Sequence, residues 1–255
     1  MQAMVLVKPG PIESRPLKLT DRPAPEPGPN AVRLEVKTCG VCRTDLHICE
    51  GELPPHKSPV IPGHQAVGTV EKLGPGARKL ALGERVGVPW LYKTCGACRW
   101  CREGRENLCD NALFTGYDAD GGFAEYLVVP EDFAYPLPAN YSDAEAAPLL
   151  CAGVIGYQAL EKAGLTQPSK LGIFGFGSSA HILIQVARHQ GHEVYVVSRT
   201  REELDLADKL GARWAGQKIE DMATLLDAVI VFAPSGELIA RALEKVGKGG
   251  RVVAA

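Results

Sequence analysis

The sequence lacks any apolar run long enough to cross a membrane as a helix, and it contains no repeats or low-complexity tails. Its start, MQAMVLVKPGP, has neither the basic residues nor the long apolar stretch of a signal peptide, which favours a cytoplasmic location. It also lacks a strong net charge, because 28 Lys and Arg residues nearly balance 30 Asp and Glu residues. The formal charge of -2 therefore gives no electrostatic case for a nucleic-acid or membrane partner.

The composition is that of a soluble globular protein, with 45% hydrophobic and 23% charged residues. A chain of 255 residues is long enough for one large or two ordinary domains. The eight cysteines should stay reduced in the cytoplasm. Because they are clustered, they indicate metal sites rather than disulfides.

Residues 1–90 are rich in Pro and Gly and contain short runs typical of strands, such as AMVLV, AVRLEV and AVGTVEKLG. Turn signals separate these runs, which predicts a small, irregular all-β domain or barrel. The runs at 83–90 and 123–129 continue the same pattern. From about Asp143 the chain changes character, because residues 143–164 are Ala-rich and have helical periodicity.

The rest of the chain alternates between strand-like and helix-like segments. Strands are predicted at 171–174, 193–198, 227–233 and 250–255, and helices at 181–191, 201–211 and 236–247. Gly191 and Gly211 lie where two of these helices should end. Alternating strands and helices of this kind predict an α/β fold with a doubly wound parallel sheet.

Four cysteines form the strongest motif in the sequence. Two C-x-x-C steps share a cysteine and a fourth follows eight residues later, giving Cys95, Cys98, Cys101 and Cys109. This spacing lets one loop wrap a tetrahedral ion, and a closed four-thiolate set indicates a structural zinc site. The alternatives are four unrelated thiols, disulfides, which the reducing setting disfavours, and a nucleic-acid-binding zinc ribbon, which the charge balance disfavours.

A second group of candidate ligands lies in CGVCRTDLH, at 39–47, and PGHQ, at 62–65. A thiolate, a neutral imidazole and one further ligand make an open catalytic zinc site, which leaves a fourth position for water or substrate. His64 supplies the imidazole, but spacing alone does not choose between Cys39 and Cys42 for the thiolate. The alternative is that a lone Cys and a lone His are ordinary core residues.

Three neighbours of these residues favour the catalytic interpretation. Thr44 can hydrogen-bond an alcohol oxygen on the metal and pass its proton outward. Asp45 can orient a metal ligand from behind. His47 can take the proton towards solvent, because imidazole titrates near neutrality. The motif therefore combines candidate ligands with a candidate path for a proton.

The segment GFGSSAH at 175–181 follows a predicted strand and leads into a predicted helix. It gives G-x-G-x-x-A, a variant of the dinucleotide-binding fingerprint. Gly175 permits the tight turn, Gly177 lets the backbone approach a pyrophosphate, and the amides of the following helix receive its charge. Phe176 and Ser178 are the further candidate contacts in this turn. The alternative is an ordinary glycine-rich turn between a strand and a helix.

The end of the second strand indicates which dinucleotide binds. An NAD-selective site usually carries Asp or Glu there to hold the ribose 2′-hydroxyl. This chain instead has, in order, Ser198, Arg199, Thr200 and Arg201. The two arginines and two hydroxyls can hold a 2′-phosphate, which favours NADP over NAD. We interpret Glu202 and Glu203 as first-turn helix residues favoured by the dipole, and the alternative is an exposed basic turn without a cofactor role.

Together these residues resemble the zinc-dependent alcohol dehydrogenases of the medium-chain dehydrogenase/reductase family, whose motifs occur in the same order along the whole chain. The resemblance implies a GroES-like catalytic domain at 1–152 and a Rossmann dinucleotide-binding domain at 153–255. It also implies two zinc ions per chain, one catalytic and one structural, and NAD or NADP as cofactor. The expected reaction is hydride transfer that interconverts small alcohols with aldehydes or ketones.

The resemblance also assigns the ligands of the catalytic zinc. The family's first ligand is the Cys of its G-V-C-x-T-D motif, which is Cys42 in this sequence. His64 falls in the family's G-H-E motif, and Cys151, in LLCAGV, matches the third ligand. The likeness thus decides a choice that spacing leaves open.

Other positions follow from the same likeness. Thr44 and His47 match the family's proton relay, and Asp45 matches its carboxylate behind a ligand. Arg43 lies where the family contacts the cofactor pyrophosphate. Trp90, in VPWL, lies where an aromatic side chain lines the alcohol pocket. These residues are therefore expected around the catalytic zinc and the cofactor.

Three features depart from the family's pattern. Gln65 replaces the usual Glu after His64, a carboxylate thought to help ligand exchange at the metal, and predicts a slower enzyme. Ile155 stands where many members carry a Thr beside the nicotinamide. The chain ends in RVVAA, which matches the fifth Rossmann strand, so we expect the last strand and the return to the catalytic domain to be missing.

The expected truncation bears on assembly and activity. In this homo-oligomeric family the sixth strand commonly forms the dimer contact, and its loss would leave the fifth strand as an exposed edge. The alternative to an active dehydrogenase is therefore a non-catalytic remnant of such an enzyme that keeps the structural zinc.

Overall fold

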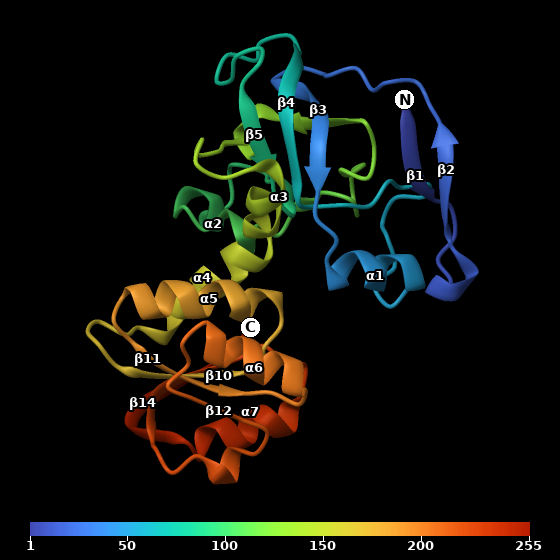
Figure 1. Ribbon diagram of the computed structural model, residues 1–255. Coiled ribbons are helices and arrows are strands. Elements are labelled where there is room, and N and C mark those ends of the chain that lie inside the picture. Colours follow the sequence, from blue (N-terminus) through green and yellow to red (C-terminus); the bar gives the residue numbers. More distant parts are fainter. The chain divides into compact units, whose positions relative to one another are not determined.

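The computed structural model describes residues 1–255, and the chain divides into an N-terminal unit, Met1–Cys151, and a C-terminal unit, Ala152–Ala255 (Figure 1). None of the helices is both long and apolar enough to cross a membrane. Because the division falls directly after Cys151, every candidate metal ligand belongs to the N-terminal unit. The candidate glycine turn belongs to the C-terminal unit.

The N-terminal unit is built on a five-stranded antiparallel sheet with the order β8-β3-β4-β5-β9. Its strands are β3 (Ala31–Cys39), β4 (Ala66–Leu73), β5 (Arg85–Val88), β8 (Tyr126–Pro130) and β9 (Tyr135–Pro136). Strand β3 pairs with β4 so that Cys39 lies opposite Ala66. This register places the residues after Cys39 beside those before Ala66, which is where the thiol and imidazole motifs lie.

Smaller elements complete this unit. Two-stranded sheets are formed by β1 (Gln2–Leu6) with β2 (Leu17–Asp21) and by β6 (Leu91–Lys93) with β7 (Leu113–Phe114). The α-helices are α1 (Arg43–Glu50), α2 (Arg99–Arg102) and α3 (Asp143–Ala146), and the 3₁₀ turns are η1 (Ile12–Ser14), η2 (Glu106–Leu108), η3 (Glu131–Phe133) and η4 (Ala147–Leu150). The pair of β6 and β7 closes the base of the loop that carries the four clustered cysteines.

The core of the N-terminal unit follows from the alternation of side chains along its strands. Val32 and Leu34 on β3 are fully buried, as are Val86 and Val88 on β5 and Leu127 on β8. Burying a side chain of this size contributes about 1.5–3 kcal/mol. The sheet is therefore a packed base from which the connecting segments present the polar motifs.

The C-terminal unit contains a five-stranded parallel sheet with the order β12-β11-β10-β13-β14. Its elements are α4 (Ala152–Ala163), β10 (Lys170–Phe174), α5 (Ser178–His189), β11 (Glu193–Val197), α6 (Arg201–Lys209), β12 (Trp214–Gly216), η5 (Ile219–Asp221), β13 (Leu226–Val231), α7 (Gly236–Leu243) and β14 (Val246–Ala254). In chain order within the unit, the strands run 3-2-1-4-5, which is the order of a doubly wound sheet. The predicted fold class is confirmed.

Helices cover both faces of this sheet because its side chains alternate. Leu171 and Ile173 on β10 pack with residues of α4, α5 and α6, whereas Phe174 belongs to the cluster that includes α7. Helices α5 and α7 accordingly lie on opposite sides of the strand layer in Figure 1. With both faces covered, the carboxyl edge of the strands remains for ligands, where the glycine turn after β10 lies.

Two details differ from the sequence-based expectation. Strand β12 is not predicted, because its three residues are too few to show an alternating pattern. The helical pattern at 143–164 is broken into α3, η4 and α4, since Pro148 cannot donate a helical hydrogen bond. Cys151 lies in this break with φ -133° and ψ -73°, outside any helix. The interruption therefore coincides with one of the candidate ligands.

Replacing Leu171 with Ala should lower the free energy of unfolding of the C-terminal unit by about 2–5 kcal/mol, because the fully buried side chain leaves a cavity. The matched control is Leu243→Ala in the same unit, where the side chain is 61% exposed and the expected loss is below about 0.5 kcal/mol. Urea unfolding followed by circular dichroism measures both. Equal losses would contradict the assignment of Leu171 to the core.

Candidate functional site

The structure brings Cys42, His64 and Cys151 together. One ligand atom from each lies within 4.8 Å of the others, and the sulfurs of Cys42 and Cys151 are 3.8 Å apart. Sulfurs bound to one tetrahedral zinc at about 2.3 Å lie about 3.8 Å from each other, so this separation fits a shared ion. Cys39 is not part of the group, since its sulfur contacts the backbone oxygen of Gly40 at 3.7 Å.

A buried carboxylate ties two of these residues together. Asp45 is 2% exposed, and its Oδ1 accepts hydrogen bonds from His64 Nδ1 at 2.9 Å and from the Gly63 amide at 3.2 Å. Its Oδ2 accepts the Cys42 amide at 2.8 Å, at the start of α1. Because a carboxylate can only accept, Nδ1 of His64 carries a proton, and Nε2 is the ring nitrogen that remains available to a metal. Asp45 therefore fixes the orientation of His64 beside Cys42.

The three residues shift one another's pKa values. The pKa of Cys42 falls to about 3, chiefly through its hydrogen bond with Cys151 and further through His64, and burial opposes this fall. Burial by itself lowers the pKa of His64, but hydrogen bonds with Asp45 and Cys42 outweigh it and raise that pKa to about 9. The pKa of Cys151 is raised by its hydrogen bond to Cys42 and by burial. The group thus favours a thiolate, the form of Cys that binds metals.

Helix α1 presents the candidate proton relay beside this group. Thr44 Oγ1 lies 3.8 Å from the Cys42 sulfur, and His47 follows three residues later on the same helix. His47 Nδ1 is hydrogen-bonded to Glu52, a contact that sequence reasoning missed. Gly51, at φ 86°, ends the helix and turns the chain so that Glu52 reaches back. A helix-ending glycine close to a histidine is the only signal in the sequence for this contact.

The remaining candidates of the N-terminal unit take different positions. The Trp90 ring lies edge-on to the His64 ring at 5.0 Å between centroids and stacks on Phe114. Gln65 is buried directly after His64, with 3% exposure. Arg43 is exposed on the first turn of α1. Trp90 and Gln65 thus lie beside the metal group, while Arg43 faces solvent.

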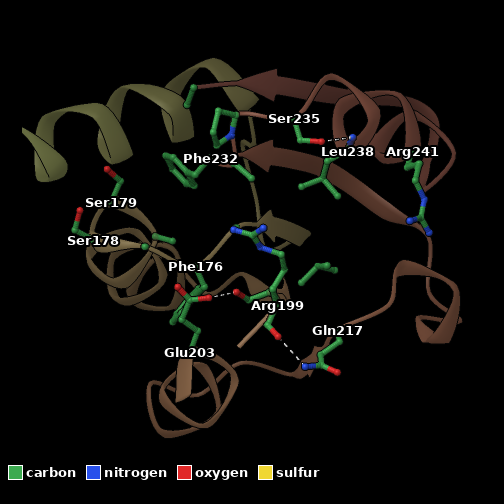
Figure 2. A pocket seen from close by; sticks show the side chains of 18 of the residues that line it. Phe176, Ser178, Ser179, Arg199, Glu203, Gln217, Phe232, Ser235, Leu238 and Arg241 are labelled. Atoms are coloured by element: carbon green, nitrogen blue, oxygen red, sulfur yellow. Dashed lines mark hydrogen bonds between the residues drawn. The ribbon is translucent and has the colours of Figure 1, made fainter. Parts of the chain in front are cut away.

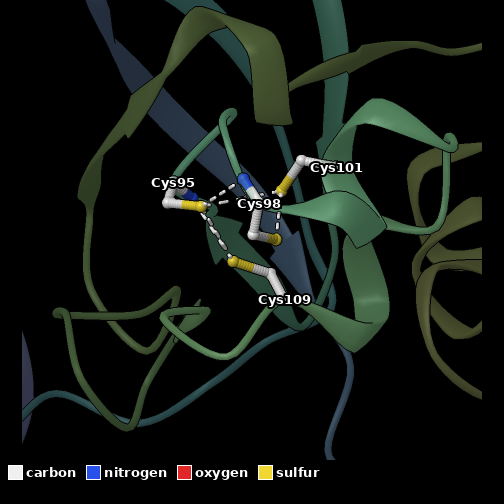
Figure 3. A group of neighbouring side chains, drawn as sticks. All are labelled: Cys95, Cys98, Cys101 and Cys109. Carbon is white, nitrogen blue, oxygen red and sulfur yellow. Dashed lines mark hydrogen bonds between the residues drawn. The ribbon is translucent and has the colours of Figure 1, made fainter.

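The four clustered cysteines also converge on one point (Figure 3). Their sulfurs all lie within 4.8 Å of one another, with 3.5 Å between Cys98 and Cys101, 3.6 Å between Cys95 and Cys109, and 4.0 Å between Cys95 and Cys101. These values bracket the roughly 3.8 Å expected around a tetrahedral zinc and are far longer than a disulfide bond of about 2 Å. The geometry fits a shared ion.

Backbone amides surround this second sulfur group. The amide of Cys98 donates to the Cys95 sulfur at 3.3 Å, and the amides of Cys95 and Asn111 donate to the Cys109 sulfur at 3.4 Å. Hydrogen bonds from the amides of Ala97 and Cys98 lower the pKa of Cys95 to about 6. The loop therefore stabilises thiolates through its own backbone, and a four-coordinate ion held by these four sulfurs would have no open position.

The glycine turn of the C-terminal unit opens into a cavity of about 660 Å³ (Figure 2). The predicted contacts Gly175, Phe176, Gly177, Ser178, Ser198 and Arg199 all line it. Gly175 has φ 89°, and a Cβ there would lie 2.9 Å from the Ala233 amide nitrogen, so the turn requires glycine. A Cβ on Gly177 would meet no protein atom within 4 Å and would project into open space where the backbone is bare. This bare turn at the start of α5 fits a dinucleotide pyrophosphate.

Part of this cavity was not anticipated from the sequence. Residues that follow β13 also line it, namely Phe232, Ala233, Pro234, Ser235, Glu237, Leu238 and Arg241. The rule that ligands bind at the carboxyl ends of parallel strands could have found them, because β13 is the neighbour of β10 in the sheet.

The structure confirms Glu203 as a first-turn residue of α6 and adds a contact that the sequence did not predict. The Glu203 side chain lines the cavity and accepts a hydrogen bond from Ser198 Oγ. Gln217 lines the same wall and donates from Nε2 to the backbone oxygen of Arg199 at 2.7 Å. The end of β11 therefore offers an acidic group as well as a basic one.

Two protein-family models match the chain. The model for the alcohol dehydrogenase GroES-like domain matches residues 28–139, and the model for the zinc-binding dehydrogenase domain matches residues 180–255. The first match covers most of the N-terminal unit, and the second covers most of the C-terminal unit. They fall in the order in which the N-terminal and C-terminal units occur.

Curated proteins and solved structures agree with these matches. A probable alcohol dehydrogenase, AdhA, of Mycobacterium tuberculosis is 48% identical, covering 98% of this chain and 74% of the relative. An alcohol dehydrogenase of Geobacillus stearothermophilus is 38% identical, covering 94% and 74%. The cobalt- and zinc-bound alcohol dehydrogenase of Pyrobaculum aerophilum matches with a TM-score of 0.89 and 30% identity, covering 100% and 76%. The NADP(H) complex of the CAD protein from Helicobacter pylori matches with a TM-score of 0.88 and 26% identity, covering 100% and 76%.

Replacing Asp45 with Ala should destabilise the N-terminal unit by about 2–5 kcal/mol, because two buried donors and one partly buried donor lose their acceptor. Asp45→Asn keeps an acceptor oxygen and should lose less. The exposed Asp208 is the control, and its replacement by Ala should change stability by less than about 0.5 kcal/mol. Denaturant unfolding in the presence of a chelator measures the effect without bound metal, and an unchanged Asp45→Ala midpoint would refute the prediction.

Proposed function

Because the chain belongs to the zinc-binding alcohol dehydrogenase family, we propose that it interconverts small alcohols with aldehydes or ketones by hydride transfer with NAD(P). The observation that carries this proposal is the convergence of Cys42, His64 and Cys151 beside Thr44 and Trp90. Three protein ligands leave one position open, as a catalytic zinc site requires.

Cys42, His64 and Cys151 would hold the catalytic zinc. The ion supplies Lewis-acid chemistry that polarises the substrate oxygen and lowers the pKa of an alcohol. Asp45 fixes the His64 tautomer, so that Nε2 faces the metal group. Trp90 packs against His64 and would form an apolar wall for a small substrate.

Thr44 and His47 would move the proton that an alcohol loses. The Thr44 hydroxyl lies next to the metal group and can accept the proton and donate its own. His47 lies three residues further on α1 and is partly exposed, so it can pass the proton to solvent. Its contact with Glu52 holds Nδ1 and leaves Nε2 for this exchange.

Cys95, Cys98, Cys101 and Cys109 would hold a second, structural zinc. Their closed four-sulfur geometry supports this role, because a four-coordinate zinc with protein ligands only has no position for substrate. The ion would tie α2 and η2 to the ends of β6 and β7. We therefore propose two zinc ions per chain.

The cavity of the C-terminal unit would bind the dinucleotide. Gly175, Gly177 and Ser178 would receive the pyrophosphate at the start of α5. The nicotinamide supplies the carbon that exchanges a hydride with the substrate. Arg199 at the ribose end supports a preference for NADP, since a guanidinium pairs well with a 2′-phosphate.

The decisive test compares Cys42→Ser with Cys39→Ser, the other thiol of the motif. The unaltered chain should bind about two zincs and oxidise small primary alcohols, and Cys42→Ser should lose turnover and one zinc. Cys39→Ser should keep both, because its sulfur lies outside the group. Metal analysis and nicotinamide absorbance give the two readouts. Full activity in Cys42→Ser would contradict the assignment of Cys42 as a zinc ligand. About one zinc without turnover in the unaltered chain would favour a non-catalytic remnant.

Restoring a carboxylate next to the metal group should accelerate the enzyme. Gln65→Glu adds a charge at a buried position beside His64, where it can assist ligand exchange, and kcat should rise on the order of tenfold. The matched control is Gln190→Glu, the same change at an exposed position at the end of α5. Steady-state kinetics measure both variants. A Gln65→Glu variant with unchanged or lower kcat and normal zinc content would show that the neutral side chain does not limit turnover.

A further inference from the structure

Glu203 is held at the wall of the dinucleotide cavity rather than on the open surface of α6. The buried Ser198, 5% exposed, donates its hydroxyl hydrogen to Glu203 Oε2. The Glu203 amide in turn donates to Thr200 Oγ1 at 3.3 Å, which fixes the start of the helix. The Ser198 hydroxyl therefore keeps this carboxylate close to the end of β11, while Thr200 fixes the backbone that carries it.

Arg199 supplies the opposite charge on the same wall. Its backbone is held by the 2.7 Å hydrogen bond from Gln217, and its side chain reaches into the cavity together with that of Glu203 (Figure 2). The other arginine that lines the cavity, Arg241, is paired with Glu220. Arg199 is thus the lining guanidinium that remains for a ligand.

These two charges act in opposite directions on the ribose 2′ substituent that distinguishes the two dinucleotides. A carboxylate accepts a hydrogen bond from a 2′-hydroxyl but repels a 2′-phosphate, which carries up to two negative charges. A guanidinium attracts the phosphate and gains little from the hydroxyl. Because Ser198 already donates to Glu203, its hydroxyl hydrogen is engaged and does not help to bind a phosphate.

We propose that Glu203 sets the balance between NAD(H) and NADP(H): its carboxylate accepts the ribose 2′-hydroxyl and opposes the 2′-phosphate, which Arg199 attracts. This inference rests on the proposed function, since it requires a nicotinamide dinucleotide in the cavity. It adds a residue that works against the NADP preference expected from the basic turn. The chain should therefore discriminate less between the two cofactors than Arg199 alone would allow.

The test is to titrate the whole chain with NADH and with NADPH and to monitor binding through the fluorescence of the reduced nicotinamide, which needs no turnover. Glu203→Gln should tighten NADPH binding on the order of tenfold, by removing a nearby like charge, and should leave NADH binding equal or weaker. The gain should shrink at high salt, because the effect is electrostatic. Glu202→Gln is the matched control, since Glu202 is the exposed neighbour in the same helix turn and does not line the cavity.

A second variant tests the opposite sign. Arg199→Ala should weaken NADPH binding on the order of tenfold and change NADH binding little. If Glu203→Gln leaves the ratio of the two dissociation constants the same as Glu202→Gln does, the role of Glu203 is refuted while the cofactor site stands. If neither dinucleotide binds the unaltered chain, the proposed function fails at its cofactor, which is a separate and distinguishable result.

Discussion

The site of the N-terminal unit depends on one buried carboxylate. Asp45 accepts hydrogen bonds from the imidazole of His64, from the amide before it and from the amide of Cys42. These donors come from opposite ends of the connection between β3 and β4, so the carboxylate closes that connection around the metal group. A carboxylate is expensive to bury, and three donors, one of them an imidazole, offset that cost. The arrangement ties ligand orientation directly to the folding of the sheet.

Much of the fold and of the candidate sites could be predicted from local sequence. Short strand-like runs between turn signals predicted the β-rich first unit, and the alternation of strands and helices predicted the parallel sheet of the second. The four cysteines were found because their spacing alone brings the sulfurs together. Spacing alone could not select Cys42 over Cys39 as the ligand, since both thiols lie just before helix α1. Resemblance selected Cys42, and the structure shows the Cys39 sulfur against its own backbone neighbour, Gly40.

What the sequence did not predict depends on side-chain direction in the folded chain. Glu203 has the sequence features of an ordinary first-turn acid, and only the placement of β11 beside α6 directs it to Ser198. Glu52 reaches His47 because a glycine turn reverses the chain after α1. Strand β12 is too short for a pattern. Both contacts join residues only five positions apart, and they depend on the turn between the two residues, which no local period encodes.

The two candidate metal groups differ in how they depend on folding. In the four-cysteine loop, the contacts between sulfurs span at most 14 residues, so only a short loop must close to assemble the ligands. Cys42 and Cys151 are 109 residues apart in the sequence, and their sulfurs meet only after the sheet has formed and η4 has ended. Closing the longer loop costs more chain entropy, and the packing of the sheet, rather than the metal, offsets this cost. An ion bound by Cys42 and Cys151 would therefore report that the whole N-terminal unit has folded, whereas an ion in the four-cysteine loop would need only local structure.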